Sequence, residues 1–284
     1  MVKNIKDFAS RHDFIEWLKK VLSEKGVKIK KRLSQTFLID LNELKYIATT
    51  IKNEAVNTPC IIEIGAGIGN LSIFLALENS DKVVVSIEID KQFTDFLKEL
   101  QDDFPNIDFI IGDAKLILNS IRDCNAVVGN LPYHITSQLL VTIAKGNADI
   151  ALVTVQKEVA ERIISKPGSR NYGKLTVFLQ HLFHVKYLKT ISLNKFYPKP
   201  EVHSAVVILK RKRVYDDFSK LFENVVKCLF SFRRKVISKA LTKCLDGNVV
   251  EYFNGLKEVW GKRVYQLSVE ELEKIVYTLA KQKS

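Results

Sequence analysis

Between residues 59 and 156 short apolar runs alternate with amphipathic stretches, and this alternation constrains the fold more than any other feature. Buried strands are predicted in PCIIEIG, KVVVSIEID, IDFIIGDA, AVVGN and DIALVTVQ, and helices in NLSIFLALE and KQFTDFLKELQ. Repeated strand–helix order predicts an α/β fold, in which helices cover both faces of a parallel sheet. Two later strands, near residues 182–191 and 203–210, are predicted to form an antiparallel hairpin that closes the sheet edge.

Both ends of the chain have a different pattern from the middle. Residues 8–25 carry apolar residues at helical spacing, and Gly26 is predicted to end that helix. After the basic run Lys210–Arg213 the pattern is wholly helical. Ser268 is predicted to be an N-cap, with Glu271 at the spacing of a capping box.

The formal net charge of +12 is concentrated at the two ends of the chain. Residues 1–40 carry 10 basic and 5 acidic residues, and residues 210–284 carry 17 basic and 9 acidic residues. The middle is close to neutral, with 17 basic and 18 acidic residues. Basic ends around a neutral core suggest a polyanionic partner that is bound at the periphery, although solubility alone is an alternative explanation.

Several classes of protein are disfavoured by the sequence. No apolar run approaches the roughly 18 residues of a membrane span, and the N-terminus lacks the apolar core of a signal peptide. We therefore expect a cytoplasmic protein with no membrane partner. The four cysteines show no CxxC pairing, so reduced, buried thiols are expected and no metal site is predicted.

Three glycines, Gly65, Gly67 and Gly69, directly follow the first predicted strand. Glycines at such a turn let a ligand approach the backbone, with the N–H groups of the next helix facing it. A dinucleotide fingerprint, G-x-G-x-x-G, needs its third glycine at position 70, where this chain has Asn70, so the turn argues against a pyrophosphate cradle. The simpler alternative is a tight corner without a ligand.

Acidic residues end the second and third predicted strands. Glu88 is placed to accept hydrogen bonds from both hydroxyls of a ribose, and Asp113 to receive an adenine amino group. Either residue alone has a simpler role as the cap of the following helix. Their succession after the glycine turn predicts a ligand with a ribose and an adenine but no pyrophosphate, and S-adenosylmethionine fits that description.

The stretch Asn130-Leu131-Pro132-Tyr133 ends the fourth predicted strand, beside the same site. The Asn130 side-chain oxygen and a carbonyl near Pro132 are two acceptors for the N–H bonds of an adenine amine. Pro132 stiffens the turn, and Tyr133 offers a ring for an unpaired base to stack on. A strand-ending turn with a buried tyrosine is the alternative. His134 is interpreted as a helix-start residue and not as a general base.

Several segments together resemble the ribosomal RNA adenine N6-dimethyltransferase family, over nearly all of the chain beyond residue 30. They are RLSQTFLID, EIGAGIG, SIEID, GDA, NLPY, VQKEVAERI, NYGKLTVFLQ, FYPKPEVHSAVV and FSFRRKVISKAL. NLPY, the two prolines of FYPKPEV and the RRK motif favour the small-subunit branch over the resistance methylases. Departures from the family pattern include Ser34 for glycine, Thr36 for asparagine or histidine, Ala66 for proline and His203 for aspartate.

The resemblance implies a set of site residues. Those expected at the cofactor are Thr36, Leu38, Gly65, Gly67, Gly69, Glu88, Ile89, Asp113, Ala114 and Asn130. Those expected to be catalytic are Asn130, Leu131, Pro132, Tyr133 and Phe196. Phe196 is expected to form the second face of the base pocket. Arg233, Arg234 and Lys235 are predicted to lie on a helix and to contact RNA phosphates.

The fold implied by the resemblance is a Rossmann-like class I methyltransferase with a mostly parallel seven-stranded sheet and a small all-helical C-terminal domain. The domain boundaries expected are a helical extension at 1–30, an S-adenosylmethionine-dependent methyltransferase domain at 31–209 and a helical RNA-binding domain at 210–284. A monomer is expected.

The activity implied is dimethylation of two adjacent adenosines in a hairpin loop near the 3′ end of 16S-type ribosomal RNA. The small ribosomal subunit is the expected partner, with a role in its biogenesis. Three alternatives stay open: a large-subunit methylase of the resistance type, a non-catalytic assembly or transcription factor that binds RNA or DNA, and a DNA adenine methyltransferase.

Overall fold

The structure is a computed structural model, and it describes residues 11–24, 26–30, 33, 35–245 and 257–281. The chain divides into two compact units, each of which is built from two segments. The first comprises Met1–Lys157 and Lys186–Lys210, and the second comprises Glu158–Val185 and Arg211–Ser284. The predicted boundaries at residues 30 and 209 stay a prediction.

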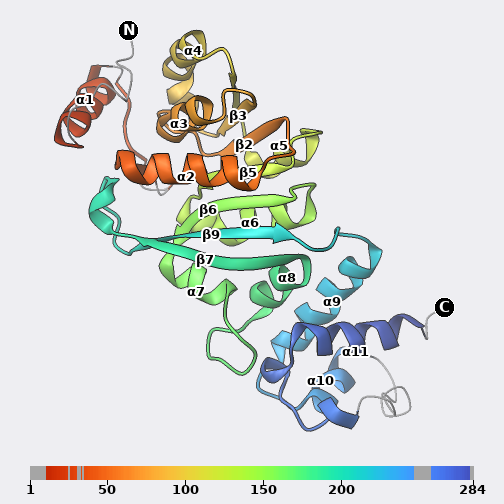
Figure 1. Ribbon diagram of the computed structural model, residues 1–284. Helices are drawn as coiled ribbons and strands as arrows, with labels where there is room; N and C mark the ends of the chain where they lie inside the picture. The colour runs from red at the N-terminus through yellow and green to blue at the C-terminus, as the bar shows by residue number, and fades with distance from the viewer. Residues whose placement is uncertain (1–10, 25, 31–32, 34, 246–256, 282–284) are drawn as a thin grey trace. The chain divides into compact units, whose positions relative to one another are not determined.

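A mostly parallel seven-stranded sheet is the main feature of the fold (Figure 1), as the sequence predicted. The strands are β2 (Cys60–Ile64), β3 (Val83–Glu88), β4 (Ile107–Ile111), β5 (Ala126–Asn130), β6 (Ile150–Gln156), β7 (Phe183–Ile191) and β9 (Ser204–Arg211). Their order in the sheet is β4-β3-β2-β5-β6-β9-β7. The first five strands pair in parallel, and β9 is antiparallel to β6. The two late strands, β7 and β9, are neighbours, as expected for a hairpin at the sheet edge.

Helices of the first unit flank these strands. They are α1 (Arg11–Glu24), α2 (Leu41–Glu54), α3 (Asn70–Glu78), α4 (Thr94–Asp103), α5 (Ala114–Ile117) and α6 (Thr136–Lys145). Side-chain caps fix where some of them begin, because Asp40 accepts a hydrogen bond from the Glu43 N–H at 3.2 Å at the start of α2. All five residues of β2 are buried, as expected for a central parallel strand. Short strands β1 (Phe37–Leu38) and β8 (Phe196–Tyr197) pair antiparallel in a separate sheet.

The second unit is helical and has its own core. Its helices are α7 (Lys157–Ile163), α8 (Lys174–Leu182), α9 (Asp217–Ser231), α10 (Ile237–Cys244) and α11 (Val269–Lys281). Buried side chains such as Phe222 and Ile275 form the core between them. The predicted capping box of α11 is confirmed, because the Ser268 N–H donates to Glu271 and the Glu271 N–H donates to Ser268, at 2.9 and 3.2 Å. No helix in the described parts of the chain is long and apolar enough to cross a bilayer.

The prediction that Arg233, Arg234 and Lys235 lie on a helix is wrong. Helix α9 ends at Ser231, and the three basic residues form the turn between α9 and α10. Backbone bonds to another segment replace the helical ones, since the Val264 and Tyr265 N–H groups donate to the carbonyls of Lys235 and Arg233 at 3.1 Å each. The apolar spacing through Val236 misled the prediction, because that residue pairs with Arg263 in an isolated β-bridge.

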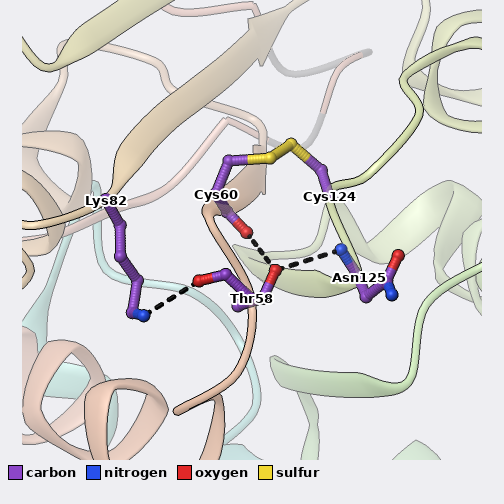
Figure 2. The surroundings of a disulfide bond; sticks show 5 residues. All are labelled: Thr58, Cys60, Lys82, Cys124 and Asn125. Atoms are coloured by element: carbon purple, nitrogen blue, oxygen red, sulfur yellow. Dashed lines mark hydrogen bonds between the residues drawn. A yellow bond between two sulfur atoms is a disulfide. The ribbon is translucent and has the colours of Figure 1, made fainter.

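The expectation of four reduced thiols is also wrong. Disulfides join Cys60 to Cys124 and Cys228 to Cys244, with Cα–Cα distances of 4.9 and 5.8 Å. Figure 2 shows the first, which links the start of β2 to the loop before β5 and lies beside a hydrogen-bonded Thr58. The partners are 64 and 16 residues apart in the chain, so a search for closely spaced cysteine pairs does not find them.

Candidate active site

The carboxyl ends of β2, β3, β4 and β5 surround a cleft with an empty volume of about 730 Å³. The lining residues are Leu33, Gln35, Thr36, Phe37, Ile64, Gly65, Gly67, Ile87, Glu88, Ile89, Phe93, Gly112, Asp113, Ala114, Asn130, Leu131, Pro132, Ile135 and Leu139. Ten of the residues predicted from the sequence are among them: Thr36, Gly65, Gly67, Glu88, Ile89, Asp113, Ala114, Asn130, Leu131 and Pro132.

The glycine turn forms one wall of this cleft. Gly65 and Gly67 have φ values of +82° and +57°, a backbone conformation that favours glycine. A Cβ on Gly67 would lie 2.9 Å from the Phe37 ring, so a side chain there would collide with the opposite wall. The missing Cβ of Gly67 therefore lets the Phe37 ring pack directly on the turn, whereas a Cβ on Gly65 would have only the Asn130 carbonyl oxygen within 4 Å, at 3.7 Å.

Glu88 lies at the end of β3 and is 6% exposed. Its carboxylate accepts hydrogen bonds from the backbone N–H groups of Gly67 and Asp90, at 2.7 and 2.8 Å. Burial raises the pKa of Glu88, while these hydrogen bonds act in the opposite direction. The carboxylate is thus held in one orientation, and its remaining lone pairs are available to ligand hydroxyls.

Asp113 and its neighbours line another part of the cleft. Asp113 caps α5 by accepting a hydrogen bond from the Lys115 N–H at 2.9 Å, which confirms the alternative role as the cap of the following helix. The same residue still lines the cleft together with Ala114. Ile89 adds an apolar surface there, and its side chain is 48% exposed. A flat heterocycle fits such a surface, with a polar edge facing Asp113.

Asn130 ends β5, and the two polar atoms of its side-chain amide have different surroundings among the described residues. Its Nδ2 donates to the Thr36 carbonyl at 2.9 Å, which fixes the orientation of the amide. Its Oδ1 is buried and accepts no hydrogen bond from any residue that the structure describes. A buried acceptor without a donor costs about 1–3 kcal/mol, so the site favours an incoming N–H group.

Backbone contacts hold the rest of the NLPY turn. Leu131 is buried, and its N–H donates to the Thr154 carbonyl at 2.9 Å. The Pro132 carbonyl accepts from the Thr136 hydroxyl at 2.9 Å. A Cβ on Gly129, one residue before Asn130, would lie 2.5 Å from the Ile64 carbonyl oxygen. The strand before the turn therefore packs too closely on β2 for any other residue.

Four residues predicted from the sequence do not line the cleft. The Tyr133 hydroxyl pairs with the Ser204 hydroxyl at 2.6 Å, and burial raises the pKa of Tyr133. Phe196 is 2% exposed, so its ring must be uncovered before it can stack on a base. Leu38 is buried in β1, where its carbonyl accepts from Asn70, and Gly69 begins α3 with a φ of +76°.

The basic turn in the second unit contains two kinds of residue. Arg233 donates to the carbonyls of Arg170 and Tyr172 at 3.0 Å each, and its guanidinium lies over the Tyr265 ring. Arg233 therefore has an internal structural contact. Arg234 and Lys235 are exposed.

Sequence reasoning missed several residues near the cleft. Gln35 and Phe93 line it, and Asp90 lies next to it behind Glu88. Glu63 is buried on β2, where burial raises its pKa to about 7 despite hydrogen bonds from Ser72 and Ser86. Of these four residues, Glu63, Gln35 and Asp90 stand inside the motifs EIGAGIG, RLSQTFLID and SIEID, and that position was the available signal.

Known proteins resemble this chain along most of its length. The family model described as ribosomal RNA adenine dimethylase matches residues 26–281. A ribosomal RNA small subunit methyltransferase A from Thermotoga maritima is 38% identical over 253 residues, which cover 88% of this chain and 85% of the relative. A probable protein of the same name from Thermococcus sibiricus is 35% identical over 263 residues, which cover 90% of this chain and 93% of the relative.

Solved structures show the same fold. A dimethyladenosine transferase from Plasmodium falciparum superposes with a TM-score of 0.68 at 22% identity, covering 86% of this chain and 97% of that one. The 23S rRNA methyltransferase ErmE superposes with a TM-score of 0.63 at 25% identity, covering 86% of this chain and 99% of that one.

Proposed function

Since the chain belongs to the ribosomal RNA adenine dimethylase family, we propose that its substrate is a pair of adjacent adenosines in a hairpin loop near the 3′ end of small-subunit rRNA. The family membership makes the chain an rRNA adenine N6-dimethyltransferase that depends on S-adenosylmethionine. We further propose which adenosines are methylated, which residues bind them, and that the small ribosomal subunit is the partner. Relatives named small subunit methyltransferase A support the choice of subunit.

The observation that carries the proposal is the buried Asn130 Oδ1 beside the glycine turn, which has no hydrogen-bond donor within the described part of the chain. The lone pair of an adenine amine is delocalised into the ring, so the amine is a weak nucleophile. An acceptor that pulls on one of its N–H bonds favours a tetrahedral nitrogen and frees the lone pair. Asn130 Oδ1 is such an acceptor, and the Thr36 carbonyl keeps it in place.

The hydrogen-bond acceptors and apolar side chains of the cleft fit S-adenosylmethionine. Glu88 is proposed to accept from the ribose hydroxyls, Asp113 to accept from the adenine amine, and Ile89 and Ala114 to cover the adenine ring. Gly65, where an added Cβ would have only the Asn130 carbonyl oxygen within 4 Å, is proposed to leave space for the methionine part. When bound, the cofactor supplies an electrophilic methyl group on sulfur. The chain itself contributes positioning and hydrogen bonds, with no covalent intermediate.

Tyr133 and Phe196 are proposed to hold the target base, with the ring of Phe196 uncovered when RNA binds. Exposed Arg234 and Lys235 are proposed to contact RNA phosphates, in a C-terminal segment of residues 210–284 that carries 17 basic and 9 acidic residues. We further propose that the enzyme acts as a monomer, in the cytoplasm, on a largely assembled small subunit.

Methyl transfer to undermodified small subunits tests the proposal. The protein is incubated with labelled S-adenosylmethionine and subunits that lack the modification, and the labelled bases are mapped. We expect label on two adjacent adenosines of small-subunit rRNA. Bound cofactor without transfer would contradict the proposed activity, and label only in large-subunit rRNA would favour the resistance type.

Asn130→Ala tests the assigned acceptor. We expect S-adenosylhomocysteine to bind nearly as tightly as it does to the wild type, while the transfer rate falls by about 10²–10³-fold, as for other single groups that stabilise a transition state. The exposed neighbour His134 provides the control, since His134→Ala should leave both quantities unchanged. An unchanged rate in Asn130→Ala would remove that residue from the mechanism.

A further inference from the structure

Helix α1 lies outside the part of the chain that the family model matches, residues 26–281. It is nevertheless docked on the core of the first unit, because Phe14 and Leu18 are fully buried and Leu22 is 7% exposed. Trp17 of α1 packs against Phe96 of α4, with ring centroids 6.3 Å apart. This helix is therefore an added part of the first unit's core.

From α1 the chain runs directly to the loop that follows Glu88. Gly26, with a φ of +63°, ends α1, and the Val27 N–H donates to the Leu22 carbonyl at 2.8 Å. The Lys28 N–H donates to Gln92 Oε1 at 3.0 Å, and Gln92 Nε2 donates back to the Lys28 carbonyl at 3.1 Å. This reciprocal pair fixes the path of the chain just after the helix.

Asp90 is the point where this path joins the cleft. Its Oδ1 accepts from Lys30 Nζ at 2.6 Å and its Oδ2 from Gln35 Nε2 at 2.8 Å. The Lys30 N–H in turn donates to Gln35 Oε1 at 2.7 Å. Asp90 is 4% exposed, and its own N–H donates to Glu88. Asp90 thus connects two parts of the chain, because its carboxylate holds the segment after α1 and its backbone N–H holds the Glu88 carboxylate at the end of β3.

The same segment reaches Asn130. Gln35, Thr36 and Phe37 form a wall of the cleft, and the Thr36 carbonyl accepts the hydrogen bond that orients the Asn130 amide. Movement of this wall would therefore disturb the proposed ribose acceptor Glu88 and the proposed amine acceptor together.

We propose that α1 and Asp90 act as a clamp that positions the wall formed by Gln35, Thr36 and Phe37, so that cofactor affinity and methyl transfer depend on a helix outside the family's common core. This inference rests on the proposed function of the cleft. Asp90 is a positioning residue in it, since it acts through Glu88 and Gln35. Lys30 is the cation that holds Asp90 to the wall.

Full-length variants test the clamp at both of its ends. Lys30→Met and Asp90→Asn break the ion pair, and the double variant Phe14→Ala/Leu18→Ala loosens α1. S-adenosylhomocysteine is the probe, and its Kd is measured by calorimetry at a temperature where circular dichroism shows every variant to be folded. Lys30→Met and Asp90→Asn should each raise the Kd by about tenfold, as expected for one lost charge-assisted hydrogen bond, and the double variant should raise it in the same direction because the wall loses the helix that holds it.

Two controls and a second readout separate positioning from general stability. Lys20→Ala, on the exposed side of α1, should leave the Kd unchanged, and Lys30→Arg should restore most of the wild-type affinity. In clamp variants the KM for S-adenosylmethionine should rise and kcat should fall. Folded variants with wild-type Kd and KM would overturn the clamp while leaving the proposed function intact. A wild-type protein that does not bind the probe would overturn both.

Discussion

Replacement of Glu63 by glutamine should make the protein more stable at pH 8 but not at pH 5. Glu63 is 1% exposed on β2, and its carboxylate accepts hydrogen bonds from the hydroxyls of Ser72 and Ser86. Burial raises its pKa from the ordinary 4.5 to about 7, the Ser72 and Ser86 hydrogen bonds act in the opposite direction, and the negative charge of Glu88 adds to the increase.

The sign of the pH dependence follows from proton binding. Between pH 4.5 and about 7 the folded protein keeps a proton on Glu63 that the unfolded chain has lost. Rising pH therefore lowers the free energy of unfolding across this window, by at most about 1.4 kcal/mol per pH unit and about 3 kcal/mol in total. Above about pH 7 the contribution of Glu63 is constant. Glutamine resembles the protonated acid and has no such dependence.

Urea unfolding of the wild type and Glu63→Gln at intervals from pH 5 to 8 measures this difference. The two proteins should have similar midpoints at pH 5, and the variant should be more stable by up to about 3 kcal/mol at pH 8, with the same slope m. Asp102→Asn, an exposed carboxylate on α4, controls for the change in net charge. If the free energies of unfolding of the wild type and Glu63→Gln changed in parallel between pH 5 and 8, the raised pKa of Glu63 would be refuted.

Further predictions concern the disulfides and the basic turn. Reduction should cost about 4 kcal/mol at Cys60–Cys124 and about 3 kcal/mol at Cys228–Cys244, because the closed loops span 64 and 16 residues. Melting curves with and without a reductant, compared with single Cys→Ser variants, measure this cost, and identical melting temperatures would contradict it. Alanine at Arg234 or Lys235 should weaken binding to the subunit, and each change should reduce the slope of log K against log salt concentration by roughly 1. An unchanged slope would mean that these side chains are solvated and do not contact phosphates. Arg233→Ala should instead lower the melting temperature, since it removes two internal hydrogen bonds.

The cleft was predictable because parallel strands end at one edge of a sheet. Gly65, Glu88, Asp113 and Asn130 each follow an apolar run, and the order of the strands brings them together without any knowledge of the loops. What could not be predicted depends on contacts between distant segments. Lys30 and Asp90 are 60 residues apart, and no local sequence pattern around either residue predicts their ion pair.

The basic turn illustrates a second limit. Apolar spacing at Phe232 and Val236 continued the helical pattern of α9, yet bonds from Val264 and Tyr265 end the helix earlier. Tertiary hydrogen bonds outweighed local preference, as they often do. In the same turn Arg233 makes an internal contact while Arg234 is exposed, and a count of basic residues does not distinguish the two.

Glu88 and Asp90, two residues apart, show how the environment divides roles between similar groups. Burial opposes the ionisation of Asp90, but hydrogen bonds from Lys30, Gln35 and Gln92, together with the charge of Lys30, outweigh it and lower its pKa. Two donors reach each Asp90 oxygen, so its four acceptor positions are filled and it is suited to fix structure.

Glu88 is in the opposite situation. Its carboxylate accepts from the neutral backbone N–H groups of Gly67 and Asp90, the Ile89 N–H acts on its pKa in the same direction, and burial raises that pKa. A carboxylate with fewer donors, and with no ion pair to any residue that the structure describes, gains more from incoming hydroxyls than one that is already saturated. The difference in partners, and not in residue type, therefore assigns ligand binding to Glu88 and positioning to Asp90. Lys30→Met should weaken this difference between the two carboxylates, because it removes a cation that lowers the pKa of Asp90 and holds its side chain in place.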